Sequence, residues 1–83
     1  MSTPLSKFIR DATPAERERC AMLAGTSVGY LYQIAGCHRP RPSASLALLL
    51  EDATRKLSEE THGRLQTIDM RTITTMCALA GIV

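Results

Sequence analysis

Residues 17–36, RERCAMLAGTSVGYLYQIAG, place small and apolar side chains where two short helices have to cross closely. Ala21 lies at the expected crossing point, where a side chain much larger than a methyl group would push the helices apart. Gly25 follows four residues later, at the end of the first helix, where a positive φ is needed and glycine adopts it without steric cost. Ser27 is then placed to cap the second helix with its hydroxyl. This spacing predicts a helix-turn-helix, with a second helix over about 27–35.

The second helix of this unit has two different faces. Leu31 and Ile34 lie three positions apart and form an apolar face toward the first helix. The outward face carries Val28, Gly29, Tyr32 and Gln33. Glycine inside a helix costs about 1 kcal/mol relative to alanine. A surface helix with this composition is typical of one that contacts a partner, and Gly29 would let the backbone approach that partner closely.

Capping signals predict two helices at the N-terminal end of the chain. Pro4 opens the first of them, with Ser2 or Thr3 as its cap. Its apolar residues fall at amphipathic spacing and are Leu5, Phe8, Ile9 and Ala12. The sequence Thr13-Pro14-Ala15-Glu16 combines a cap, a proline at the first helical position and a glutamate at the third, which is a capping box.

Beyond the helix-turn-helix, a proline-containing loop leads to a leucine-rich helix capped by Ser43. Its expected apolar stripe is Leu46, Leu49, Leu50, Ala53 and Leu57. A weak alternation indicates one short strand near 64–68, and the last helix is expected over about 69–80. These elements predict an all-α bundle of four or five helices in one domain, residues 1–83.

Composition sets further bounds. A chain of 83 residues buries only about 60–65% of its unfolded surface, so dimerisation would help its thin core. The net charge of +2 is too small to indicate nucleic acid by itself, so the distribution of charge matters more. With no membrane-length apolar run and no signal-peptide core at the N-terminus, we expect a cytosolic protein.

Catalysis and metal binding are not expected. The sequence holds no Ser/His/Asp or Cys/His constellation and no phosphate-binding glycine loop, which argues against an enzyme. Its three cysteines, an odd number without paired spacing, fit reduced thiols better than disulfides. Cys37 and His38 are adjacent, but no C-x-x-C or H-x-x-x-H accompanies them. We therefore predict no metal and no cofactor.

Residues 17–54, with a helix before and a leucine-rich helix after, resemble the DNA-binding domain of the lambda-repressor and Cro-like superfamily. Within it, GTSVGYLYQIAGCHRPRPS from Gly25, followed by E-x-T-x-G-x-L-x-x-x-D-M-R over 59–71, is similar to Cro-like and YdaS-like regulators of phages and prophages. The resemblance implies a helix-turn-helix bundle that binds an operator in double-stranded DNA as a homodimer and represses transcription.

In this geometry the N-terminal part of the second helix enters the major groove. The expected base contacts are Ser27, Val28, Gly29, Tyr32 and Gln33. Gln33 is the leading candidate, because its amide can pair with N6 and N7 of adenine, a contact worth about 1–3 kcal/mol against the wrong base. The alternative is that Gln33 is an ordinary solvent-exposed helix residue with no role in binding.

Basic residues predict where the DNA backbone lies. The expected phosphate contacts are Arg17, Arg19, His38, Arg39 and Arg41. Arg17 and Arg19 lie at the start of a helix, where cations oppose the macrodipole, so a nearby phosphate would account for them. The glutamates that alternate with these arginines support equally well the alternative that this is an ordinary solvent-exposed face of mixed charge.

The alternative function is a helical adaptor or antitoxin-like protein. Such a protein would bind another protein through the face formed by Met70, Ile73 and Met76, although core packing is the default for such a stripe.

Overall fold

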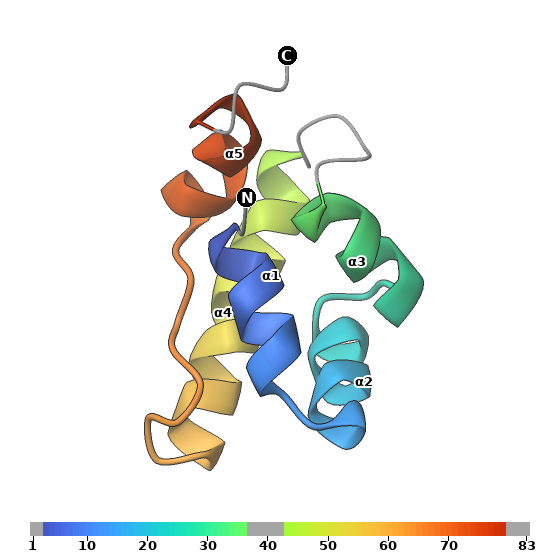
Figure 1. The fold of residues 1–83 in the computed structure, drawn as a ribbon, viewed down its shortest axis with the longest axis vertical. Coiled ribbons are helices and arrows are strands. Elements are labelled where there is room, and N and C mark those ends of the chain that lie inside the picture. The colour runs from blue at the N-terminus through green and yellow to red at the C-terminus, as the bar shows by residue number, and fades with distance from the viewer. Residues whose placement is uncertain (1–2, 37–42, 80–83) are drawn as a thin grey trace.

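A computed structural model describes residues 3–36 and 43–79, the side chains of residues 76–79 excepted. Its elements are α1 (Pro4–Asp11), α2 (Pro14–Leu23), α3 (Val28–Ala35), α4 (Ala44–Glu60) and α5 (Met70–Leu79). The packed pairs close a ring in which α4 contacts α2, α2 contacts α3, α3 contacts α1, α1 contacts α5 and α5 contacts α4. Figure 1 shows α1 in front of α4, with α2 and α3 on one side and α5 at one end. The all-α fold class is confirmed.

The helix starts lie where the capping residues predict them. Thr3, Thr13, Ser27 and Ser43 each accept a hydrogen bond through the side-chain oxygen from the backbone N–H three residues on. At Thr13 the capping box is complete, because Glu16 Oε1 also accepts from the Thr13 N–H at 2.8 Å. Each side-chain oxygen satisfies one of the backbone donors that a helix start leaves without an internal partner.

The interior is built from aliphatic side chains of all five helices and of the segment that precedes α5. All four apolar residues predicted for the first helix are buried. Leu31, Ile34, Leu50, Leu57, Leu65 and Ile73 are at most 1% exposed. Alanines at positions 21, 24, 47 and 53 are buried as well, so α2 and α4 pack through small residues.

The predicted stripe on α4 is wrong at one position. Leu49 is 45% exposed, and the buried face instead runs through Ala47, Leu50, Ala53 and Leu57, with Leu46 only half-buried. The sequence LALLL at 46–50 presents leucines on several faces of a helix, and its periodicity alone does not decide between them. The small side chains of Ala47 and Ala53 face inward because the neighbouring helices approach there.

The short strand predicted near 64–68 is absent; none of residues 64–68 is in a strand. The segment is extended but buries Leu65 and Ile68, three positions apart, while Thr67 is exposed. An isolated extended segment has no ladder partner, so its backbone finds side chains instead. The Ile68 N–H donates to Thr54 Oγ1 at 3.0 Å.

Candidate nucleic-acid interface

The turn between α2 and α3 is closed by backbone hydrogen bonds. The Thr26 N–H donates to the Ala21 carbonyl at 2.8 Å, and the Gly25 N–H donates to the Met22 carbonyl at 3.1 Å. This pair of bonds is the Schellman arrangement, which places a left-handed residue after the helix. Gly25 has φ +72°, so the predicted role of this glycine is confirmed. The turn leads directly to Ser27, the cap of α3.

Both ends of α3 are held by hydroxyl groups. Ser27 Oγ accepts from the Tyr30 N–H at 3.1 Å at its start. At its end, the buried Thr3 hydroxyl donates to the Ala35 carbonyl at 2.8 Å, which joins the start of α1 to the end of α3. Since Leu31, Ile34 and Ala35 are buried, the inward face predicted for this helix is confirmed.

The opposite face of α3 is exposed at four of the five positions predicted to contact bases. Ser27, Gly29, Tyr32 and Gln33 are exposed, and Tyr32 retains 48% of its surface. Val28 is only half-buried because part of its side chain packs against the core. Tyr30 is likewise half-buried against the core. The exposed residues form one outward surface on α3.

Nothing within the described structure accounts for glycine at position 29. Its φ is not positive, unlike that of Gly25. A Cβ atom added there would meet only Ser27 Oγ, 4.0 Å away. Alanine would therefore fit without displacement and would favour the helix. This distinguishes Gly29, on the outward face of α3, from a glycine that a tight turn or a close helix crossing requires.

Arg17 has a structural partner that the sequence did not reveal. Its Nε donates to the Ile9 carbonyl at 2.8 Å, so a cation in the first turns of α2 caps the C-terminal end of α1. A positive side chain is favourable at that negative end. Among the described residues, the terminal Nη1 and Nη2 atoms of Arg17 donate no hydrogen bond.

Arg19 is engaged on the other side of α2. Its Nε and Nη2 donate three hydrogen bonds to the Glu60 carboxylate, the Nε–Oε1 distance being 2.7 Å, and so join α2 to the end of α4. This contact holds the pKa of Glu60 below its ordinary value. Of the predicted phosphate contacts in the described part of the chain, Arg19 is the one whose fork is already occupied.

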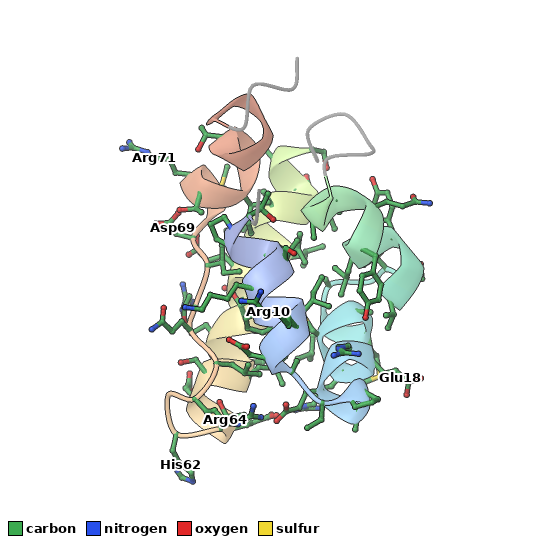
Figure 2. The ribbon with its side chains drawn as sticks, viewed as in Figure 1. Arg10, Glu18, His62, Arg64, Asp69 and Arg71 are labelled. Atoms are coloured by element: carbon green, nitrogen blue, oxygen red, sulfur yellow. The ribbon has the colours of Figure 1, made fainter. Side chains whose placement is uncertain are left out.

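Three predicted phosphate contacts, His38, Arg39 and Arg41, lie outside the described residues. One basic residue that the sequence did not single out is Arg10, near the end of α1. Its Nε lies 3.9 Å from Asp11 Oδ1, and its side chain is 66% exposed. Figure 2 shows Arg10 on the front of α1, and its side chain lines a groove together with Tyr32 of α3. No local motif marks it, because only the packing of α1 against α3 brings it to this surface.

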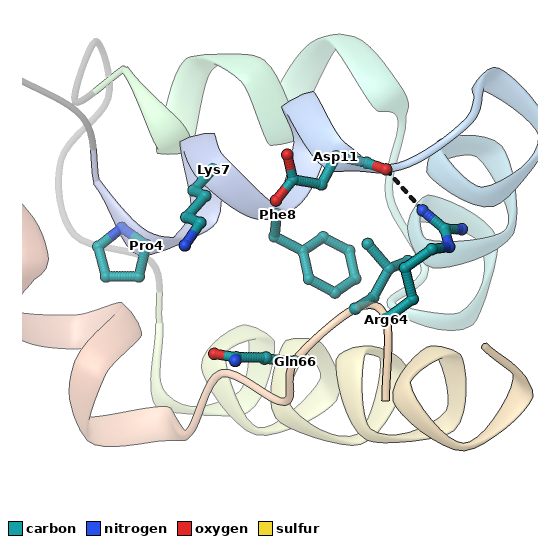
Figure 3. A pocket seen from close by; sticks show the side chains of 7 residues that line it. Pro4, Lys7, Phe8, Asp11, Arg64 and Gln66 are labelled. Atoms are coloured by element: carbon teal, nitrogen blue, oxygen red, sulfur yellow. Dashed lines mark hydrogen bonds between the residues drawn. The ribbon is translucent and has the colours of Figure 1, made fainter. Parts of the chain in front are cut away.

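Arg64 in the segment 61–70, unlike Arg10, is engaged in close contacts within the protein. Arg64 donates to the Glu16 carboxylate and, at 2.8 Å, to the Asp11 carbonyl. This contact is the main reason that the pKa of Glu16 lies below its ordinary value, and the Thr13 N–H lowers it further. Figure 3 shows Arg64 beside a small pocket of about 140 Å³ that is also lined by Lys7 and Asp11.

Metal and thiol chemistry find no support in the described residues. In that part of the chain, no group of three His, Cys, Asp or Glu side chains is placed to hold a metal ion. Cys37 and His38 fall outside it, as does the side chain of Cys77. Cys20 is a buried core residue whose pKa is raised to about 11 by burial, so its thiol stays protonated. None of the described helices has the length and apolar character needed to span a membrane.

Comparison of the chain with protein-family models, with curated proteins and with solved structures found no match.

Proposed function

We propose that this protein is a sequence-specific DNA-binding regulator that inserts α3 into the major groove. Three features support the proposal. The α2–turn–α3 unit is held at the turn and at both ends of α3 by hydrogen bonds. The inward face of α3 is fully packed. Its outward face is exposed and carries small and hydrogen-bonding side chains, as a helix that reads bases requires.

Gly29 is the observation that carries the proposal. Alanine at this position would favour the helix and would meet no obstacle within the described structure. A glycine on an exposed helix face lets the backbone of α3 approach a partner more closely than any other residue allows. The edges of base pairs in the major groove are such a partner, since the helix must come close to read them.

The proposed roles follow from side-chain chemistry. Gln33 pairs with adenine, and Ser27 hydrogen-bonds a base or the adjoining backbone. The exposed part of Val28 contacts a thymine methyl group. Tyr32 lies next to the sugar-phosphate backbone of the DNA. Phosphates are contacted by Arg17 and by the basic loop residues, with Arg39 first among them and His38 and Arg41 beside it, whereas Arg19 is the weakest candidate because Glu60 occupies its fork.

We further propose a homodimer that acts in the cytosol as a Cro-like repressor. A two-fold protein reads two half-sites about 34 Å apart, one turn of the double helix. Two copies of α3 would then enter successive major grooves on one face of the DNA. Sedimentation of the free and DNA-bound protein tests this assembly, and a monomer in both conditions would contradict it.

Gly29→Ala gives the most informative test, because a structural and a functional role predict different outcomes. We expect the variant to be more stable to urea by up to about 1 kcal/mol. We also expect it to bind DNA from the gene's own upstream region more weakly. Ser58→Ala, which raises helix propensity on α4, is the matched control and should leave DNA affinity unchanged. Unchanged affinity in Gly29→Ala would remove the main support for the proposal.

Gln33→Ala tests sequence readout. Loss of a bidentate base contact should weaken binding to the target by about 1–3 kcal/mol and binding to random DNA much less. Equal loss on both DNAs would remove Gln33 from the base contacts. Binding of the unmodified protein should also fall steeply as salt rises, because bound counterions are released from the phosphates.

A protein partner is the second candidate function. Leu48 and Leu49 are 50% and 45% exposed on α4, side by side in the sequence. The adaptor face predicted from the sequence is instead part of the core as far as it is described, since Ile73 is buried and Met70 packs against the core. An adaptor that uses Leu48 and Leu49 would bind its partner with little dependence on salt and would shift no DNA fragment from the upstream region.

A further inference from the structure

A groove of about 400 Å³ lies beside the outward face of α3, between α1, α2 and α3. Arg10 of α1, Arg17 of α2 and Tyr32 of α3 line it, together with Ser6. The apolar part of its wall comes from Ile9 and Ala35. Because Tyr32 belongs both to this groove and to the outward surface of α3, the two are continuous.

The charge of the groove is one-sided. Two guanidinium groups line it, and no acidic residue does so among the described lining residues. Asp11, next to Arg10 in the sequence, lines the smaller pocket instead. Glu16 and Glu18 flank Arg17 in the sequence, but neither lines the groove. That smaller pocket is the useful contrast, because its Arg64 is already bound to a carboxylate and to a carbonyl. In the groove, by contrast, two cations share one space with no acidic residue lining it, and Arg10 has only the 3.9 Å contact of its Nε with Asp11.

Arg17 is positioned for a ligand in a particular way. The hydrogen bond from its Nε to the Ile9 carbonyl holds the guanidinium at the wall of the groove. Its two terminal nitrogens donate nothing within the described residues. An arginine fork that is anchored at one edge loses less freedom when the other edge binds a planar or tetrahedral anion. Arg10, with only a 3.9 Å contact to Asp11, supplies the second charge.

From these observations we infer that the groove is a binding site for one phosphate group of the DNA backbone, bound by Arg10 and Arg17 with the hydroxyl groups of Tyr32 and Ser6. The inference deepens the proposed function and rests on it. With this site, α1 becomes part of the DNA interface through Arg10 and Ser6, and Tyr32 contacts a phosphate of the DNA backbone. A phosphodiester supplies the single negative charge and the acceptor oxygens that these four donors need.

The test compares Arg10→Ala with Arg71→Ala. Both variants remove one arginine that is exposed, but Arg71 projects from α5, away from the groove (Figure 2). Affinity for duplex DNA is measured over a series of salt concentrations. Arg10→Ala should lower the slope of log affinity against log salt by up to about 0.9 per protomer, the value for one phosphate in each half-site, and should weaken target and random DNA alike. Arg71→Ala should leave the slope unchanged. Equal slopes for both variants and the unmodified protein would overturn the inference.

A second arm identifies the phosphate and separates this inference from the proposed function. Replacing one backbone phosphate at a time by an uncharged methylphosphonate should reveal a position where the replacement weakens binding of Arg10→Ala much less than binding of the unmodified protein. If the unmodified protein binds DNA but no such position exists, the groove assignment is wrong while DNA binding stands. If no duplex binds, the proposed function fails. Inorganic phosphate is then titrated while the amide resonances of residues 6–10 and 32 are followed. Shifts there would retain a site for free phosphate, and their absence would overturn the groove as well.

Discussion

The outward surface of α3 and the segment 61–70 are both polar, yet their groups are used in different ways. In the segment, Arg64 binds Glu16, the Ile68 N–H donates to Thr54, and the Met70 N–H donates to Glu51 Oε1 at 2.8 Å. On α3, Gly29 has almost no neighbour and Tyr32 is nearly half exposed. The polar groups of the segment stabilise the fold, whereas Gly29 and Tyr32 leave part of the surface of α3 open to solvent.

The segment 61–70 needs these hydrogen bonds because residues 64–69 are in neither a helix nor a strand. Thr54 is completely buried on α4, where its hydroxyl donates to the Leu50 carbonyl at 2.9 Å and accepts from Ile68. Asp69 Oδ1 accepts from the Thr72 N–H at 2.7 Å and so starts α5. Together with the burial of Leu65 and Ile68, these contacts hold the segment against α4. A surface built in this way is poorly suited to adapt to a partner.

The largest expected effect comes from the buried side of α4 and separates two adjacent leucines. Leu50→Ala should destabilise the protein by about 2–5 kcal/mol, because the side chain is fully buried and its removal leaves a cavity. Leu49→Ala, the matched control, should cost much less because that side chain is 45% exposed. Urea unfolding of the two variants measures the difference. Equal losses would contradict the orientation of α4 described above.

A smaller effect is expected at Thr54. Thr54→Val keeps the shape of the side chain but leaves the buried Ile68 N–H without its acceptor, which should cost about 1–3 kcal/mol. Thr75→Val is the control, because that hydroxyl donates only to the carbonyl of Arg71 in its own helix. DNA affinity at a temperature where both variants are folded should be unchanged. A selective loss of DNA binding in Thr54→Val would place the segment 61–70 in the interface.

The smallest effect is a dependence of stability on pH from the ion pairs that join α2 to the end of α4 and to the segment. Arg64 and the Thr13 N–H lower the pKa of Glu16 in the folded protein, so the folded state binds that proton at lower pH than the unfolded chain. The resulting stability is present above the ordinary glutamate pKa of 4.5 and is lost as pH falls through the folded value. Glu60 acts in the same direction through Arg19.

Melting temperatures measured between neutral pH and about pH 3 check this prediction. Glu16→Gln should lower the melting temperature at neutral pH and flatten its fall in acid. Glu59→Gln is the matched control, since Glu59 is exposed and its carboxylate has no ion pair among the described residues. A variant at Glu16 that keeps the full acid dependence would show that the pair with Arg64 contributes nothing.

The difference between the two regions also explains what the sequence predicted well. Caps and turns depend on residues within a few positions of one another, so Thr13 with Glu16, Gly25 and Ser27 could be assigned from local spacing alone. The inward residues Leu31 and Ile34 followed from the period of a helix. The same local chemistry located the outward surface of α3, and hence most of the candidate site.

Contacts between distant parts of the chain could not be predicted in this way. Nothing near Thr54 indicates that it binds residue 68, and nothing near Arg17 indicates that it caps α1. The exposure of Leu49 depends on which face of α4 the other helices cover. For the same reason Arg10 entered the candidate site only when the packing of α1 against α3 was known.

Titration of the protein with DNA from its own upstream region, followed by the backbone amide resonances, tests the central claim most directly. If α3 enters the major groove, the largest changes should fall at residues 27–33, with further changes at residues 6–10 and 17 beside the groove, and the segment 61–70 should be nearly unaffected. Changes centred on 61–70, or no change with any duplex at low salt, would contradict the account.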